Sequence, residues 1–254
     1  MDLKSYLQQF SFEQIVAIEQ QDRQFLALKQ AWEAIRKSLS KNNDINKAGD
    51  VFLLMVIYNA LISYQIAWSG ELWREEFSLF LIKEFPALHE SFVWENPRFD
   101  LWYNLMTTSR YNKRLYNLKV KRLEKFQKFV KPLKTQSLSK KWSVFLSYYQ
   151  DMNRLLIEIA ESMKMSTSAK TMTFAVKMFG YAARLVYDEF IPYPMWIKIP
   201  VDSRISLIVK HMGIEWNDEV QKYFQSLAEE FDVPPLHLDS LFWIEYWGKM
   251  GKKN

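Results

Sequence analysis

The sequence predicts an all-helical protein, and both its composition and the spacing of its apolar residues favour this class. Of 254 residues, 49% are hydrophobic, but only 6 are glycine and 8 are proline, fewer turn residues than many short strands require. Apolar side chains recur every three or four positions, the period of an amphipathic helix. The clearest such segments are residues 12–21, 22–39, 69–85 and 217–231. The length allows one large domain or two lobes with a sizeable core.

Residues 51–68 form a strongly apolar stretch in which 18 consecutive residues carry no charge. This length reaches the lower limit of a membrane span. However, Asn59, Ser63 and Gln65 interrupt the stretch, and a large helical protein needs one central helix that is apolar all round. We therefore interpret the segment as a buried core helix, with a membrane span as the alternative.

The chain contains no cysteine, and its three histidines lie far apart in sequence. Disulfides, thiolate metal sites and cysteine nucleophiles are therefore excluded, and we expect no histidine-ligated metal. The first ten residues, MDLKSYLQQF, lack the apolar core of a signal peptide. We expect an intracellular, cytoplasmic protein.

Positive charge is concentrated in one segment of the chain. Between Arg110 and Lys141 there are twelve basic residues and a single acidic one, Glu124, which leaves 22 of the 34 basic and 28 of the 29 acidic residues elsewhere. Aromatic side chains alternate with these charges, a pattern suited to a phosphate backbone. We predict a polyanionic partner. A membrane surface would produce the same charge signature and is the alternative.

The segment MSTSAKTMTF, residues 165–174, joins small hydroxyl residues to the start of an apolar helix. Ser166, Thr167 and Ser168 are natural N-cap residues, so Lys170 falls in the first helical turn. There the free backbone N–H groups and the helix dipole disfavour an ammonium group. We expect the pKa of Lys170 to be lowered toward that of a nucleophilic amine. The alternative is an ordinary solvated lysine whose stem covers apolar surface.

The segment IPYPMWIKIPVD, residues 191–202, interrupts the helices with three prolines. Proline forbids a continuous helix and makes the chain extended, and a connector of this length often serves as a crossing between lobes. It ends at Asp202, which we expect to cap the next helix. A carboxylate held at a helix N-terminus stays ionised and rigid, so it can stabilise a cation or accept a proton from an amine.

Two aromatic residues share a helix face with these polar positions. Phe174 follows Lys170 by four residues, and Trp243 follows Asp239 by four. Core packing is the simplest explanation of both aromatic residues, as it is for Trp73.

Four segments resemble, in order, parts of the archaeal GO glycosylase family, which are 8-oxoguanine DNA glycosylases of the helix-hairpin-helix superfamily. They are NALISYQIAWSGELW (59–73), SAKTMTFAVKMFGYA (168–182), IPVDSRISL (199–207) and VPPLHLDSLFW (233–243). The resemblance implies two helical lobes flanking a cleft. Hairpins of this superfamily usually turn on glycines, but residues 163–170 contain none. The expected fold is therefore a helix-hairpin-helix DNA glycosylase fold with a divergent, glycine-free hairpin.

We expect one bilobal domain over residues 1–254. One lobe, about residues 70–188, would carry Lys170. The second lobe, residues 1–68 and 199–254, would carry Asp202, and residues 191–202 would cross between the lobes.

The resemblance also implies an activity and a set of site residues. Lys170 matches the family's Schiff-base lysine and Asp202 its catalytic aspartate, in an enzyme that flips and excises 8-oxoguanine and then cleaves the strand by β-elimination. This chemistry requires no metal and no other cofactor. The implied base pocket is Gln24, Trp73, Phe174, Asp239 and Trp243. The expected contacts to the DNA backbone are Ser166, Thr167, Ser168, Arg110, Lys113, Arg114, Lys119, Lys121 and Arg122.

Tyr64 and Gln65 follow the NALIS run, where related glycosylases place a side chain that fills the gap left by the flipped base. The alternative is simply the end of a helix. As substrate we expect damaged double-stranded DNA, with single-stranded DNA as a further candidate, no membrane partner, and a monomer that acts in the cytoplasm at the nucleoid. The rival function is a non-catalytic helical module that binds nucleic acid.

Overall fold

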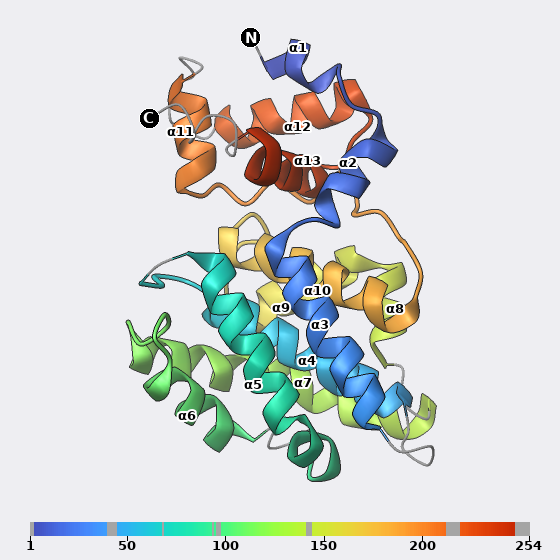
Figure 1. The fold of residues 1–254 in the computed structure, drawn as a ribbon, viewed down its shortest axis with the longest axis vertical. Helices are drawn as coiled ribbons and strands as arrows, with labels where there is room; N and C mark the ends of the chain where they lie inside the picture. Colours follow the sequence, from blue (N-terminus) through green and yellow to red (C-terminus); the bar gives the residue numbers. More distant parts are fainter. Residues whose placement is uncertain are drawn as a thin grey trace.

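The computed structural model describes residues 3–39, 45–67, 69–92, 94, 98–140, 144–211 and 219–246, and within them the protein is all-helical, without a strand. This confirms the predicted class. In chain order the elements are α1 (Leu3–Leu7), α2 (Phe12–Glu19), α3 (Arg23–Ser38), α4 (Ile45–Ile62), α5 (Gly70–Glu90), α6 (Phe99–Thr108), α7 (Tyr116–Lys140), α8 (Val144–Gln150), α9 (Met152–Met163), α10 (Lys170–Tyr187), α11 (Ser203–His211), α12 (Glu219–Phe231), α13 (Pro235–Leu241) and the π-helical turn η1 (Phe242–Tyr246) (Figure 1).

Local capping signals explain where several predicted helices begin. Asp22 accepts a hydrogen bond from the N–H of Gln24 (2.8 Å) and so starts α3. Ser69 accepts one from the N–H of Leu72 (3.3 Å) and starts α5. Each cap satisfies a backbone donor that has no partner inside its helix. The periodic segments of the sequence are therefore helices close to their predicted limits.

Helix α4 is the centre of the larger of two hydrophobic cores. Residues 48–62 are all buried, which confirms the predicted core helix. By length and composition α4 could also cross a membrane, but 83% of that window is buried inside the protein. Helices α5, α7 and α10 pack directly against it.

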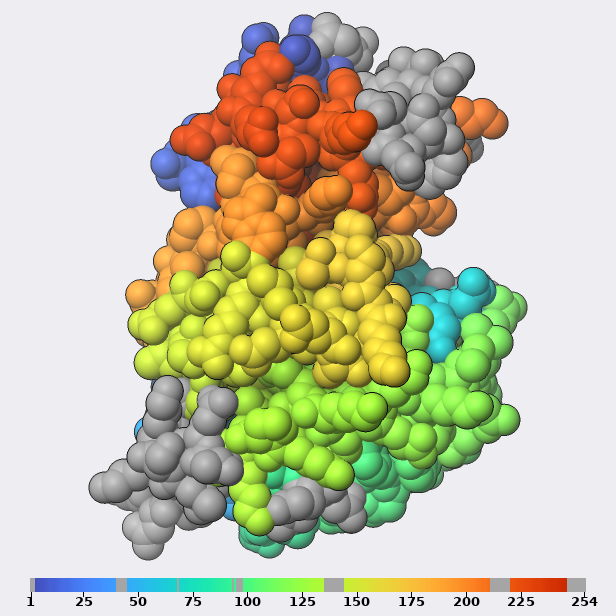
Figure 2. All heavy atoms as spheres, turned by 180° about the vertical axis from the view of Figure 1, so that it is seen from behind, coloured from blue at the N-terminus to red at the C-terminus, as the bar shows by residue number. Residues whose placement is uncertain are grey.

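The two cores divide the chain differently from the prediction. Helices α3 and α4 belong to the larger core with α5 to α10, while α1, α2 and α11 to α13 surround the smaller one (Figure 1). Seen from behind, the blue N-terminal segments and the orange and red C-terminal segments lie in one part of the molecule, and the green and yellow segments form the other (Figure 2). The expected boundary near residue 68 is thus corrected to one near residue 20. The physical reason is that the apolar faces of α3 and α4 pack against α5 and α10. For example, the ring of Phe25 on α3 meets that of Tyr181 on α10 edge to face, with 5.4 Å between the ring centres.

The segment predicted to cross between the lobes joins α10 of the larger core to α11 of the smaller one. Helix α10 ends at Tyr187 and is followed by its C-cap residue Asp188, whose φ of 53° turns the chain, and no helix forms between it and Ser203. Tyr193 anchors the crossing because its hydroxyl donates to the carbonyl of Lys177 (2.7 Å). The ring lies against Gly180, where a Cβ would approach Tyr193 Cε1 to 2.4 Å. Only glycine admits so close a contact.

Candidate active site

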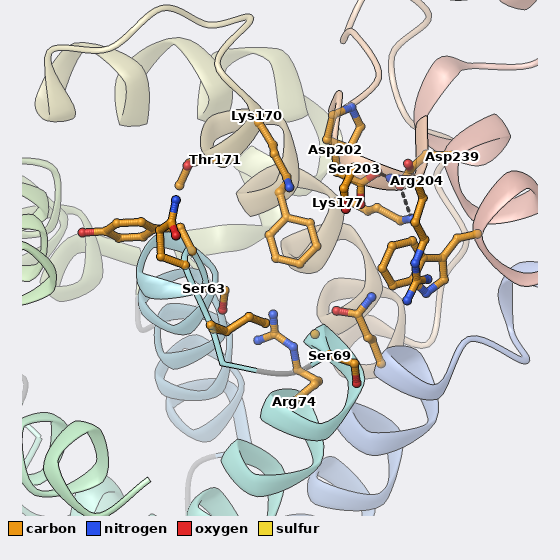
Figure 3. Close-up of a pocket in the computed structure, with 18 of the residues that line it drawn as sticks. Ser63, Ser69, Arg74, Lys170, Thr171, Lys177, Asp202, Ser203, Arg204 and Asp239 are labelled. Atoms are coloured by element: carbon orange, nitrogen blue, oxygen red, sulfur yellow. Dashed lines mark hydrogen bonds and ion pairs between the residues drawn. The ribbon is translucent and has the colours of Figure 1, made fainter. Parts of the chain in front are cut away.

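A pocket of about 450 Å³ lies between the two lobes. Its walls come from α3, α5, α7, α10 and the loop after α4 in the larger lobe, and from α11, α13 and η1 in the smaller one. Lys170 and Asp202, the two catalytic candidates from the sequence, both line it. Two polar residues on separate lobes are thereby brought to one cavity (Figure 3).

Lys170 is the first residue of α10, and its exposed side chain extends into the pocket (Figure 3). The predicted hydroxyl cap is wrong, because the N-cap residue is Ala169 and no side chain caps the helix. Ser166 and Ser168 instead share a hydrogen bond between their hydroxyls (2.8 Å). The backbone closes the turn without a side-chain cap, through the N–H of Ala169 and the carbonyl of Ser166 (3.0 Å).

Helices α9 and α10 form a hairpin whose turn contains no glycine. Lys164 ends α9 in the left-handed conformation (φ 54°), a position that glycine usually fills. The next N–H, from Met165, reaches back to the carbonyl of Ala160 (2.9 Å). The usual closure of a helix end is therefore made with a lysine in place of glycine.

Asp202 begins α11, as predicted. Its Oδ1 accepts hydrogen bonds from the N–H groups of Arg204 (2.9 Å) and Ile205 (3.0 Å). The carboxylate is half-buried and its orientation is fixed by these two donors. It faces the pocket from the smaller lobe.

Four of the five predicted base-pocket residues line the cavity: Gln24, Phe174, Asp239 and Trp243. Trp73 does not line it. Its ring is fully buried in the larger core, and its indole N–H donates to Ser63 Oγ (2.8 Å), which does line the pocket. Trp73 thus supports the wall from behind. Gln24 is 4% exposed, and its Oε1 has no hydrogen-bond donor among the described residues.

The sequence interpretation missed a buried ion pair at the pocket. Lys177 Nζ lies 2.5 Å from Asp239 Oδ2, and both side chains are buried. Burial and the nearby carboxylate of Asp202 raise the pKa of Asp239 to about 6, although Lys177 opposes the rise. Burial acts to lower the pKa of Lys177, but Asp239 and Asp22 outweigh it and raise the value. One signal was present, because Lys177 follows Lys170 by seven residues, two turns along the same helix face.

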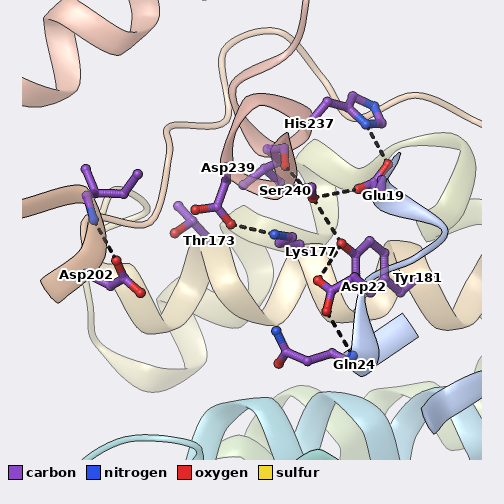
Figure 4. A network of polar contacts seen from close by, with 12 residues as sticks. Glu19, Asp22, Gln24, Thr173, Lys177, Tyr181, Asp202, His237, Asp239 and Ser240 are labelled. Atoms are coloured by element: carbon purple, nitrogen blue, oxygen red, sulfur yellow. Dashed lines mark hydrogen bonds and ion pairs between the residues drawn. The ribbon is translucent and has the colours of Figure 1, made fainter. Parts of the chain in front are cut away.

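A separate buried polar network lies beside this pair, at the boundary between the lobes (Figure 4). The carboxylate of Glu19 on α2 lies 2.8 Å from Arg184 Nη1 and 2.8 Å from His237 Nδ1, and it accepts a hydrogen bond from Ser240 Oγ (3.1 Å). The hydroxyl of Tyr181 lies 3.0 Å from that of Ser240. Burial raises the pKa of Glu19, but His237 and Arg184 outweigh burial and lower it to about 2. The network fixes α13, which carries Asp239, against α10, which carries the two lysines.

Arg204 makes a second bridge between the lobes. Its guanidinium lies over the ring of Trp243 and donates to Glu71 Oε1 (3.2 Å) on α5. The indole of Trp243 is thereby held at the pocket wall by a cation on its face.

The two residues proposed to fill the gap in DNA lie in the loop after α4, at the pocket wall. Gln65 is exposed with a left-handed backbone (φ 50°). The guanidinium of Arg122 stacks on Tyr64, 3.8 Å from the ring centre, and donates to the carbonyl of Leu61 (3.1 Å). Arg122 also lines the pocket, so the loop has a defined position beside Lys170.

The basic segment is only partly a free surface. Arg110, Lys113, Arg114 and Lys121 are exposed and available to a polyanion. Lys119 is not, because its side chain is fully buried and its ammonium donates to the side-chain and main-chain oxygens of Asn112. Burial, and then the neighbouring charge of Arg122, lowers the pKa of Lys119 to about 8. The expectation that Lys119 contacts the DNA backbone is therefore corrected.

An all-helical protein with two lobes, a helical hairpin that leads into a lysine, and a capped aspartate across an aromatic-walled pocket has the organisation of a base-flipping DNA glycosylase. The family model of AGOG, N-glycosylase/DNA lyase, matches residues 4–254. The chain belongs to this family, and it is a DNA repair enzyme that acts on DNA.

Relatives and a solved structure agree with this assignment. The N-glycosylase/DNA lyase of Methanococcus maripaludis is 38% identical over 80% of this chain and 72% of its own. That of Methanopyrus kandleri is 35% identical over 96% of this chain and 88% of its own. The crystal structure of Pa-AGOG, the 8-oxoguanine DNA glycosylase of Pyrobaculum aerophilum, complexed with 8-oxoguanosine, matches the fold with a TM-score of 0.71. It is 22% identical and covers 94% of this chain and 84% of that one.

Proposed function

We propose that this enzyme excises 8-oxoguanine from DNA and then cleaves the strand through a Schiff base on Lys170. The observation that carries the proposal is the meeting of Lys170 and Asp202, from different lobes, at one pocket with aromatic walls. The 8-oxoguanosine complex of the Pyrobaculum relative supports the choice of lesion.

The chemistry begins when the damaged nucleotide leaves the base stack and enters the pocket. The amine of Lys170 attacks the sugar C1′ while the base departs, which joins the sugar covalently to the enzyme. Asp202, held by two backbone donors, stabilises the positive charge on the sugar and accepts the proton that the amine loses. The C1′–O4′ bond then breaks, so that the sugar ring opens, O4′ takes up a proton, and an imine joins C1′ to the nitrogen of Lys170. The imine acidifies the hydrogen on C2′, and β-elimination breaks the C3′–O3′ bond on the 3′ side.

The pocket residues offer both stacking faces and polar groups for the flipped base. Phe174 and Trp243 supply the aromatic faces. Gln24 has an unused buried oxygen, and Asp239 supplies a carboxylate whose partner Lys177 holds it in place. An 8-oxoguanine differs from guanine at O8 and at the N7–H, so an acceptor that faces N7 distinguishes the two bases.

The duplex would run over the open start of α10 and the exposed basic residues that precede α7. Ser166 and Thr167 are exposed at that start, and a helix N-terminus without a side-chain cap is a binding site for a phosphate. Tyr64 or Gln65 would fill the gap left by the base. We propose that the enzyme acts as a monomer, on double-stranded DNA in the first place, in the cytoplasm at the nucleoid.

Borohydride trapping on an oligonucleotide with a single 8-oxoguanine tests the proposal. Native protein should form a covalent adduct only with the lesion, and Lys170→Ala should form none while it still binds the duplex. Lys198→Ala removes an exposed lysine from the crossing and should trap like the native protein. If Lys170→Ala also formed the adduct, Lys170 would not be the nucleophile. Duplex binding without an adduct or free base from native protein would favour the non-catalytic module.

A further inference from the structure

Arg74 is a cation at the pocket that the mechanism above does not use. It lies on α5, and its guanidinium points into the pocket from the wall opposite Lys170 (Figure 3). The side chain is fully buried. Nη1 donates to the side-chain oxygen of Asn59, while Nε has no acceptor among the described residues.

Among the described residues, Arg74 has no carboxylate within ion-pair distance, unlike two other buried cations near the pocket. Arg184 Nη1 lies 2.8 Å from Glu19, and Lys177 Nζ lies 2.5 Å from Asp239. No ion pair within the described part of the chain involves Arg74. Burial lowers the pKa of Arg74 to about 9, with Asp22 opposing, so the group remains charged at neutral pH. A buried charge without a partner destabilises a folded protein.

The position of Arg74 indicates what could neutralise it. Its Cζ lies 5.8 Å from the ring centre of Phe174, the residue expected to stack on the flipped base, and 5.8 Å from that of Phe77. The guanidinium is thus at the edge of the space that the base would occupy. Charged groups that reduce stability are common at functional sites, where a ligand supplies the missing partner.

We propose that Arg74 contacts the flipped base and stabilises the negative charge that the base acquires as the glycosidic bond breaks. This role rests on the proposed function. When the C1′–N9 bond breaks, its electron pair stays with the base, and a new bond forms between C1′ and the nitrogen of Lys170. The amine loses one proton through Asp202, and the departing base gains one. Until that proton arrives, the guanidinium N–H groups hydrogen-bond to the anionic base, in a pocket where water does not compete.

The test separates base departure from the later steps. Arg74→Met keeps an unbranched side chain of similar length without charge, Arg74→Lys keeps a charge, and Arg36→Met removes an exposed arginine from α3 as the control. Each is assayed in single turnover on a duplex with 8-oxoguanine and on a duplex with a preformed abasic site. The second substrate needs Lys170 but has no base to release.

Arg74→Met should excise 8-oxoguanine about 100-fold more slowly, the effect of losing one preorganised donor, and cleave the abasic site within about threefold of the native rate. Arg74→Lys should recover part of the excision rate. Native excision by Arg74→Met would overturn the role, and an equal loss on both substrates would make Arg74 structural. If native protein released no 8-oxoguanine, the proposed function itself would fail, and this role with it.

Thermal unfolding gives a second readout that activity does not supply. Because the methionine removes an unpaired buried charge, Arg74→Met should melt at or above the temperature of the native protein. A fall of more than about 5 °C would show that the arginine serves folding, which contradicts the proposal.

Discussion

The raised pKa of Asp239 predicts how the stability of the protein depends on pH. Its pKa is about 6 in the folded protein against an ordinary value of 3.8, a difference of roughly two. At 1.36 kcal/mol for each pKa unit, the ionised side chain lowers the free energy of unfolding by about 3 kcal/mol above pH 6. The pKa of Asp239 is higher in the folded protein than in the unfolded chain. The protein is therefore more stable by this amount below pH 4, and it loses this contribution as the pH rises through 6.

The variant Asp239→Asn isolates this contribution. When the pH is lowered from 7.5 to 5, the free energy of unfolding of the native protein should rise by about 1 to 2 kcal/mol relative to that of the variant. The reason is that the folded state takes up a proton at Asp239 over this range and the unfolded state does not. His237, whose pKa burial lowers, acts in the opposite direction, but it is present in both proteins and cancels in the comparison. Urea unfolding at the two pH values, followed by tryptophan fluorescence and by circular dichroism, measures the difference.

The control is Asp188→Asn, which changes an exposed carboxylate outside the pocket and is measured at the same two pH values. A difference between native protein and Asp239→Asn that did not change with pH would refute the reasoning. It would mean that Lys177 keeps Asp239 ionised throughout this range.

Three further substitutions follow from the same structure. Gly180→Ala should lower the free energy of unfolding by about 1 to 3 kcal/mol, because its Cβ would overlap the ring of Tyr193; unchanged urea unfolding would show that the ring can shift. Lys164→Gly should raise the free energy of unfolding by up to about 1 kcal/mol, since glycine adopts a left-handed backbone without strain. A loss of stability in urea unfolding would contradict this expectation. Trp243→Ala should weaken discrimination of 8-oxoguanine from guanine more than duplex affinity in competition assays; unchanged discrimination would restrict Trp243 to packing.

Much of the fold could be predicted because its signals are local. The helix limits follow from apolar spacing and from caps such as Ser69, and the crossing follows from three prolines. Asp202 was predicted as a cap because it is a short polar residue after proline and before a helical pattern, whereas its catalytic role was implied by the resemblance to the family and stays a prediction. In each case neighbouring residues along the chain carry the information.

The rest depends on contacts between distant segments. Trp73 and Trp243 look alike in sequence, but only the packing of α5 places the first in the core and leaves the second at the pocket wall. The same holds for the lobe to which α3 and α4 belong. Lys177 lies within an apolar helical stretch, and a charged residue in such a position indicates a buried partner or ligand without identifying it. Arg74 is followed by Glu75 and Glu76, so the sequence around it gives no such signal.

The division of the chain between the two cores also determines in which order the residues of the candidate active site become available during synthesis. The larger core uses residues 25 to 197 and one leucine, Leu236, whereas the smaller core needs both chain ends. A growing chain can therefore pack most of the larger lobe, and present Lys170, before the ribosome has added Asp202, Asp239 and Trp243. Domains fold as their segments emerge. A chain whose synthesis stops before residue 202 therefore carries the amine of Lys170 without the carboxylate of Asp202 that would assist it under the proposed mechanism. Under the proposed mechanism, the site is complete only after residues 202 to 243 have been synthesised.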